Sequence, residues 1–224
     1  HWESDPIKIT SAANPKMYYD YYGFPPETYK YQYPAPGSPA LAQRIQELLG
    51  NNKLESQLDE TRGYDHGVFI PLMVMYPEAN IPVVCVSLHQ SLDADINMQI
   101  GQSLAPLREE GILIIGSGYT FHNMNAFFNP NKETINASRS FNQWLKDTIL
   151  GTGSNYLEKL KGWAKAPGGR ICHPREEHLL PLLVTAAAGG KDAQPRLIYD
   201  TSDPATHDPF DQVSEHVVSG YIFN

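Results

Sequence analysis

A strand, a helix and a second strand follow one another in the middle of the sequence, and this order constrains the fold most. Residues 81–88 (IPVVCVSL) are apolar and β-branched, which predicts a strand. Residues 93–110 have apolar side chains on one side and a glycine directly after them, which predicts an amphipathic helix. Residues 112–115 (ILII) are apolar on both faces, as in a strand that helices cover. We therefore predict an α/β fold with a mostly parallel or mixed central sheet and helices on both faces.

The flanking segments indicate the same class. Residues 7–10 predict the end of a strand, and Ser38 followed by Pro39 predicts a helix start, with serine as N-cap and proline in the first turn. Residues 68–76 predict a buried helix with Pro71 in its first turn. Further helices are expected over residues 134–150, 154–164 and 177–188, and further strands over 196–199 and 213–223, the last antiparallel to its neighbour.

Composition narrows the class of protein. The 224 residues are 41% hydrophobic and 19% charged, which suits one compact α/β domain over residues 1–224 with a sizeable core. Two small domains are the alternative. The net charge of -8 and the lack of a basic cluster argue against a nucleic-acid partner, and no apolar run has the length of a membrane span. Cys85 and Cys172 are too few for a disulfide framework, so a cytoplasmic location is expected. The oligomeric state stays open.

A long segment without regular structure is expected over residues 11–39. It contains seven tyrosines and several prolines, so it is too aromatic for a disordered linker. Long ordered loops in small domains are often functional. The alternative is that the tyrosines hold the loop against the core.

The loop after residues 112–115 has the strongest signal for a site. Ligands of such sheets bind beyond the carboxyl ends of strands, and the glycines of Gly116-Ser117-Gly118 let the backbone approach a ligand closely. His122 follows in the same loop, and imidazole is the commonest side-chain metal ligand and proton shuttle. We expect His122 in a catalytic role, and Gly118, Tyr119 and Asn123 beside a substrate. The alternative is a loop histidine bonded to backbone carbonyls.

Two further histidine segments complete the candidate set. In Asp65-His66-Gly67, the aspartate is expected either to cap the following helix or to orient an imidazole. Glu177 and His178 open the helix predicted over residues 177–188, where neighbours point about 100° apart, so one of them would face a given site. Glu177 would suit a two-histidine, one-carboxylate metal site and His178 a three-histidine site. His173 is expected at the surface.

Ordered motifs occur along nearly the whole chain. They are Ser11-Ala12, Asn14-Pro15, Tyr19–Pro25 (YDYYGFP), Tyr33–Pro39 (YPAPGSP), Arg62–Gly67 (RGYDHG), Met75–Pro77, Ile81–Val84, Gly116–Gly118, His122-Asn123 and His173–Leu182. Together they resemble the DOPA 4,5-dioxygenase branch of the LigB-type (class III) extradiol ring-cleavage dioxygenases. Each motif alone is modest, but the ordered set is specific.

The resemblance implies residue roles. His1 and His178 correspond to metal ligands, with Glu177 as an alternative ligand. His122 corresponds to the active-site acid and base, and His66 to a second pocket histidine near oxygen and substrate. The implied metal is Fe(II), which brings a catechol such as DOPA together with O2; Zn(II) fits the same site but is redox-inert.

One part of the family pattern, a strand and the metal ligand after it, would lie before His1. The family has a strand before the position of His1, and the loop after that strand supplies another metal ligand. We therefore expect this ligand upstream, in a longer chain or a separate one. The alternative is a catalytically silent relative that binds a metal or ligand as an interaction module. The presence of His66, His122 and His178 favours the enzyme.

Overall fold

The chain divides into two units, His1–Leu92 and Asp93–Asn224. The computed structural model describes residues 2–151, 155–190, 192–202 and 215–224. Parallel and antiparallel strand pairs combine with helices, which confirms the α/β class with mixed pairing. A single domain over residues 1–224 stays a prediction.

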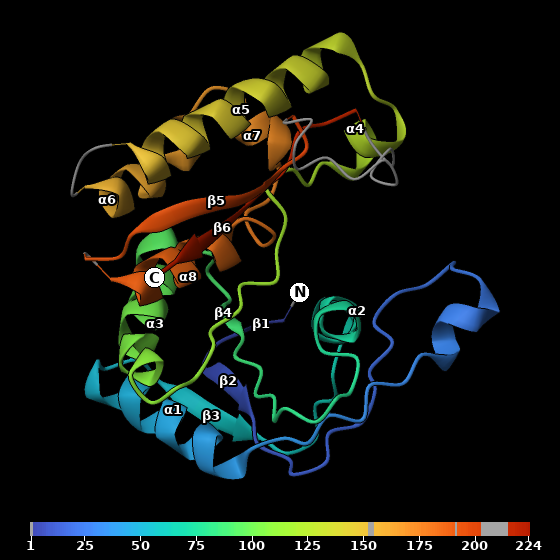
Figure 1. The fold of residues 1–224 in the computed structure, drawn as a ribbon, viewed down its shortest axis with the longest axis vertical. Coiled ribbons are helices and arrows are strands. Elements are labelled where there is room, and N and C mark those ends of the chain that lie inside the picture. Colours follow the sequence, from blue (N-terminus) through green and yellow to red (C-terminus); the bar gives the residue numbers. More distant parts are fainter. Residues whose placement is uncertain (1, 152–154, 191, 203–214) are drawn as a thin grey trace. The chain divides into compact units, whose positions relative to one another are not determined.

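Two pairs of short parallel strands lie in the first unit (Figure 1). β1 (Glu3–Ser4) pairs with β4 (Leu88–His89), and β2 (Ile7–Thr10) pairs with β3 (Ser56–Asp59). β2 confirms the strand predicted over residues 7–10, and its isoleucines are buried. α1 (Pro39–Asn51) contacts both β2 and β3, so its apolar face covers this parallel pair.

The strand predicted over residues 81–88 is wrong in extent, because only its last residue enters β4. Upstream of β4 the chain follows β2 through irregular contacts. The amide of Thr10 donates to the carbonyl of Cys85 (2.9 Å), but the amide of Cys85 donates to Oγ1 of Thr10 (2.8 Å). Pro82 has no amide to donate. A continuous ladder needs backbone donors on both strands, so these residues do not form one.

Both predicted helices of the first unit are present. α1 begins as expected, with the Ser38 hydroxyl accepting the amide of Leu41 (3.3 Å) and Pro39 in the first turn. α2 (His66–Met75) begins two residues before the predicted start. Pro71 therefore lies in the interior of the helix, and its expected place in the first turn is wrong. The expected burial is also wrong, because only Phe69 and Leu72 of α2 are buried and Val74 is 81% exposed.

The tyrosine-rich loop is irregular as predicted, apart from the 3-10 helix η1 (Pro26–Lys30). Tyr19 and Tyr21 place their rings against Phe69 of α2, with centroid distances of 6.0 and 6.2 Å. Their hydroxyls donate to backbone carbonyls of the same loop at 2.6 Å. Ring packing and hydrogen bonds together fix the loop on α2, so the prediction that tyrosines hold it against the core is confirmed for this pair.

In the second unit, β5 (Pro195–Asp200) and β6 (Ser219–Phe223) form an antiparallel pair, as predicted. Residues 203–214 lie outside the described residues, so the predicted start of the last strand at residue 213 does too. α5 (Lys132–Leu150), which contains the predicted helix 134–150, contacts β5.

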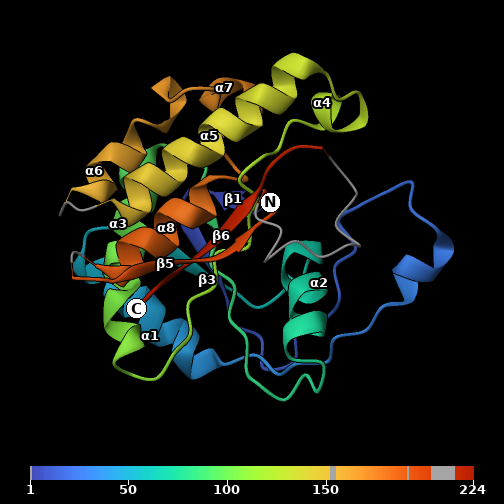
Figure 2. The same ribbon diagram turned by 45° about the horizontal axis from the view of Figure 1, so that its top comes forward.

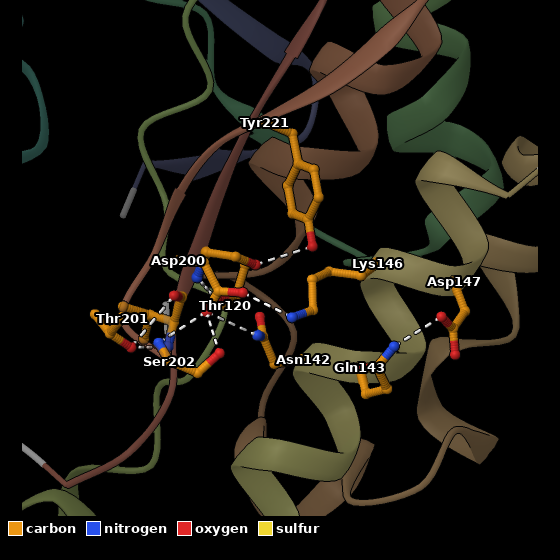
Figure 3. A network of polar contacts seen from close by, with 11 residues as sticks. Thr120, Asn142, Gln143, Lys146, Asp147, Asp200, Thr201, Ser202 and Tyr221 are labelled. Atoms are coloured by element: carbon orange, nitrogen blue, oxygen red, sulfur yellow. Dashed lines mark hydrogen bonds and ion pairs between the residues drawn. The ribbon is translucent and has the colours of Figure 1, made fainter. Parts of the chain in front are cut away.

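A partly buried ion pair joins the end of β5 to α5 (Figure 3). Asp200 is 1% exposed, and one of its oxygens lies 2.7 Å from Nζ of Lys146. The other oxygen accepts from the amide and hydroxyl of Ser202 (2.9 and 2.7 Å) and from Asn142 (3.3 Å). Burial acts to raise the pKa of Asp200, but the Lys146 and Ser202 hydrogen bonds outweigh it, so the pKa is lowered.

Helices α3 (Ala94–Leu104) and α8 (Leu180–Gly189) pack side by side in the second unit (Figures 1 and 2). A Cβ at Gly101 would collide with the carbonyl oxygen of Val184, so the two helices approach closely there. Within the described parts of the chain, no helix combines the length and apolar character needed to cross a membrane. The other helical elements of this unit are η2 (Ala105–Arg108), α4 (Met124–Phe128), α6 (Tyr156–Lys161), η3 (Trp163–Lys165) and α7 (Gly169–Cys172).

The strand predicted over residues 112–115 is not formed, and that prediction is wrong for the described structure. Leu113 and Ile115 are 61% and 44% exposed instead of buried. The amide of Ile112 donates to Leu107 (3.0 Å), and none of the described residues hydrogen-bonds to the backbone of residues 113–116. The apolar sequence predicted a covered strand, but a strand also needs a paired neighbour.

Candidate active site

Glu177 and His178 lie in a turn before α8, not in a helix. α8 begins at Leu180 because Pro181, which has no amide, fits only in the first turn of a helix. The prediction that these two neighbours point about 100° apart on a helix is therefore wrong. In the turn both side chains meet, and Oε1 of Glu177 lies 2.9 Å from Nδ1 of His178.

The loop after residues 112–115 lies against this turn. The amide of Tyr119 donates to the carbonyl of His178 (2.8 Å), and a Cβ at Gly118 would collide with that same oxygen. Glycine is needed here for close packing on the turn. A second anchor is the amide of His122, which donates to the carbonyl of Cys172 (2.9 Å). These contacts stack the rings of His122 and His178, with centroids 3.2 Å apart and planes 10° from parallel.

His122, Glu177 and His178 together form a candidate metal centre. One ligand atom from each lies within 4.8 Å of the others. Metal–ligand bonds of about 2.0–2.2 Å place ligand atoms at most roughly 4.4 Å apart, so the spacing is close to that of a metal site. The two stacked rings would have to turn for both imidazoles to bind one ion. Two imidazoles and a carboxylate suit Fe(II) in oxygenases and also suit zinc.

The second oxygen of Glu177 already faces a positive charge. Oε2 is buried and accepts no hydrogen bond among the described residues. The guanidinium of Arg175 approaches it at 3.3 Å as an ion pair. A buried carboxylate oxygen without a hydrogen-bond donor is costly unless a cation neutralises it, and the guanidinium of Arg175 supplies part of that positive charge. The metal fit of this turn therefore rests on the grouping of two imidazoles with a carboxylate.

The other predicted pocket residues have local bonding roles. Oδ1 of Asn123 accepts the amide of Ala126 (3.1 Å), which caps α4, and its amide group donates to the carbonyl of Ile171 (2.8 Å). Tyr119 is 47% exposed. Gly118 has the packing role described above. Contacts of these three residues with a substrate stay predictions.

His173 is buried, so its expected place at the surface is wrong. Nε2 lies 2.9 Å from the carbonyl of Thr120, and Nδ1 has no hydrogen-bond partner among the described residues. The rings of Phe141 and Trp163 pack against it with their edges. Burial in this apolar surrounding lowers the pKa of His173 to about 4. His173 is a neutral core residue at neutral pH.

His66, in the first unit, is paired with a carboxylate that sequence reasoning missed. Nδ1 of His66 lies 2.8 Å from both oxygens of Asp20, and the amide of His66 donates to Oδ1 of Asp20 (3.0 Å). Asp65 occupies the N-cap position of α2, but it makes no capping bond and instead binds Arg62 (2.7 Å). The expectation that Asp65 caps the helix or orients His66 is therefore wrong, and Asp20 does both.

The charge on Asp20 is stabilised by these bonds. Burial acts to raise the pKa of Asp20, but the hydrogen bonds from the amide and the imidazole of His66 outweigh it and hold the pKa below its usual value. A negative charge at the start of a helix is further favoured by the aligned peptide dipoles. Asp20 is therefore ionised at neutral pH. His1, the other predicted ligand, lies outside the described residues.

Comparisons with known proteins point to one family. Residues 1–206 match the family model described as the catalytic LigB subunit of aromatic ring-opening dioxygenase. The 4,5-DOPA dioxygenase extradiol of Beta vulgaris is 42% identical over 91% of this chain and 75% of its own length. The protein of the same name from Portulaca grandiflora is 40% identical over 92% and 76%.

A solved structure has a similar fold. The crystal structure of an uncharacterized protein from Escherichia coli K12 is 30% identical, with a TM-score of 0.75. The match covers 98% of this chain and 82% of that chain.

Proposed function

The chain belongs to the LigB family of aromatic ring-opening dioxygenases and is an extradiol dioxygenase, and we propose that it opens the ring of a catechol such as DOPA with O2 at an Fe(II) centre. The observation that supports this best is the grouping of His122, Glu177 and His178 in the second unit. The substrate class is supported by the names of the two plant relatives.

His178 is the proposed metal ligand of this group. A ligating histidine usually gives its second nitrogen to a carboxylate, and Glu177 lies at Nδ1 of His178, so Nε2 is the nitrogen that would bind the metal. His1 is the further ligand that the family resemblance implies. When bound, Fe(II) would supply a common binding place for catechol and O2 and a path for electron transfer from the catechol to O2. Zn(II) would fit the same donors but, being redox-inert, could not mediate that transfer.

Proton transfer is assigned to the two other histidines of the candidate site, His122 and His66. His122 stacks on His178, so its imidazole lies beside the proposed ligand, where it can take a proton from a catechol hydroxyl and return it later. His66 is the second proposed proton-transfer group, with Asp20 on its Nδ1. Proposed partners are therefore a small catechol and O2. A cytoplasmic location is also proposed, supported by the free thiols of Cys85 and Cys172.

One assay tests the proposal. Full-length protein is loaded with Fe(II), mixed with DOPA in air, and followed by oxygen uptake and by the yellow colour of a ring-opened product. The expected result is coupled consumption of DOPA and O2, which the variant His178→Ala lacks. Iron-loaded protein that consumes no catechol would exclude the proposal. A folded protein that binds no metal would favour the silent binding module.

A further inference from the structure

We propose that Asp20 is a positioning residue that holds His66 in the tautomer with its proton on Nδ1 and its basic lone pair on Nε2. The inference rests on the proposed function, because it names the atom of His66 that would receive a proton from the catechol. The observation behind it is that the carboxylate of Asp20 hydrogen-bonds to both the backbone amide and the imidazole of His66.

The tautomer follows from the chemistry of the two groups. An ionised carboxylate has only acceptor sites, so Nδ1 at 2.8 Å from both oxygens of Asp20 has to be the donor. A neutral imidazole with its proton on Nδ1 has an unshared pair on Nε2. None of the described residues hydrogen-bonds to Nε2, and the side chain of His66 is 43% exposed. The basic atom is therefore accessible to a small molecule.

The position of Asp20 is fixed from both sides. Its neighbours Tyr19 and Tyr21 pack on Phe69 of α2 and bond within their own loop. The amide of His66 donates to Oδ1 of Asp20, which links the carboxylate to the first residue of α2. Because the imidazole and the amide bind one oxygen, the ring orientation is tied to the start of the helix.

The pair would work as a proton acceptor in the proposed reaction. Nε2 takes the proton of a catechol hydroxyl, and the catechol oxygen keeps the electron pair of the broken O–H bond. The resulting imidazolium remains bonded through Nδ1–H to the negative charge of Asp20. A base whose second nitrogen is fixed by a carboxylate is the arrangement that activated catalytic histidines share.

A purely structural role for Asp20 is the competing explanation, and Asp59 offers a matched control. Asp59 lies in the same unit, its side chain is also 15% exposed, and it also accepts backbone amides, from Thr61 and Arg62 (both 2.9 Å). Its described contacts include no histidine. Replacing Asp59 by Asn therefore removes a similar buried charge without changing the surroundings of His66.

The first readout is the tautomer itself, measured without catalysis. Long-range 1H–15N correlation spectra of the metal-free, full-length protein identify which ring nitrogen of His66 carries the proton. The native protein and Asp59→Asn are expected to show Nδ1–H. Asp20→Ala is expected to shift the population to Nε2–H, and Asp20→Asn to give a mixture, because an amide can donate as well as accept.

The second readout is kinetic. In Fe(II)-loaded protein, Asp20→Asn and Asp20→Ala are expected to lower kcat roughly 10–100-fold with little change in KM, as for other residues that orient a reacting side chain. Asp59→Asn is expected to stay within about twofold, like most substitutions away from a site. If Asp20→Ala does not fold, Asp20→Asn, which keeps an acceptor at the same position, carries the test.

The outcomes separate this inference from the proposed function. An unchanged Nδ1–H tautomer in Asp20→Ala, or an equal loss of kcat in Asp20→Asn and Asp59→Asn, overturns the positioning role. If the native iron-loaded protein converts no catechol, the proposed function fails, and the spectra still decide whether Asp20 fixes the tautomer of His66.

Discussion

Each of the two units contains a histidine with a carboxylate on Nδ1, and the two pairs differ in what surrounds them. Asp20 meets His66 at 2.8 Å, and Glu177 meets His178 at 2.9 Å. The side chain of His178 is 17% exposed and has the ring of His122 stacked on it, whereas that of His66 is 43% exposed. A histidine–carboxylate pair can thus have two uses. In the second unit, Glu177 and His178 are candidates for a metal centre, and in the first unit, His66 beside Asp20 is an exposed candidate base.

The carboxylates differ as well. Both oxygens of Asp20 bond to His66, so this carboxylate has its acceptor sites directed at one residue. Glu177 uses Oε1 for His178, while Oε2 accepts no hydrogen bond among the described residues. Oε2 of Glu177 instead faces the guanidinium of Arg175 at 3.3 Å, so Glu177 contacts a histidine and a cation, whereas the side-chain hydrogen bonds of Asp20 go to His66 alone among the described residues.

The largest expected effect concerns His122, which either moves protons or binds the metal. As a proton shuttle, His122→Ala should lower kcat about 10²–10⁴-fold while metal content stays unchanged. Oxygen uptake and elemental analysis of the same sample measure both quantities. His89→Ala, at a histidine outside the proposed site, is the control and should retain activity. Loss of metal from His122→Ala would contradict the shuttle role and make His122 a ligand.

Replacing Glu177 should have a smaller effect, and the quantity that changes is the affinity for the metal. Glu177→Gln keeps the size of the side chain but removes the charge next to His178, so Fe(II) or Zn(II) affinity should fall roughly 10–100-fold. Competition with a chelator measures it. Glu176→Gln is the matched control, because Glu176 lies in the same turn but pairs with Arg170 (2.6 Å). Equal losses of affinity in the two variants would count against a specific role for Glu177.

The smallest expected effect comes from His173, a histidine of the second unit with no hydrogen-bond partner on Nδ1 among the described residues. Burial lowers its pKa to about 4 from 6.5, so the unfolded chain binds a proton more readily than the folded one. This contribution to stability is present above about pH 6.5 and is lost as pH falls toward 4; between pH 7.5 and 5 it amounts to about 2 kcal/mol.

Urea unfolding of the native protein and of His173→Gln at both pH values checks this. The glutamine amide can donate to the carbonyl of Thr120 as the imidazole does, but it does not titrate. The variant should therefore lose less stability on acidification than the native protein. The same pH dependence in both proteins would show that His173 is not the group responsible.

Elements with local signals could be predicted from the sequence, and those that depend on distant partners could not. Ser38 and Pro39 start α1 through contacts within one turn, and β5 and β6 follow from their own composition. Residues 112–115 have the composition of a covered strand, but no pairing partner appears among the described residues. Local chemistry determines where an element begins, whereas strand pairing is a property of the whole fold.

The candidate site shows the same division. His122 is predictable from the glycines that precede it and His178 from the family resemblance, and the structure brings their rings together. The turn at Glu177 follows from Pro181, which restricts where α8 can begin. Asp20 was missed because it bonds to His66 across 46 positions of sequence. Its position between Tyr19 and Tyr21 in the tyrosine-rich loop is the sequence signal that could indicate it.

The most direct test of the whole account is a single-turnover reaction with ¹⁸O₂. Full-length protein is loaded anaerobically with Fe(II) and DOPA, exposed to labelled oxygen, and the product is analysed by mass spectrometry. We predict a ring-opened product that contains both atoms of one ¹⁸O₂ molecule, and no such product from His178→Ala. An iron-loaded native protein that leaves DOPA intact, or a product labelled only from water, would contradict an extradiol dioxygenase built on this histidine–carboxylate cluster.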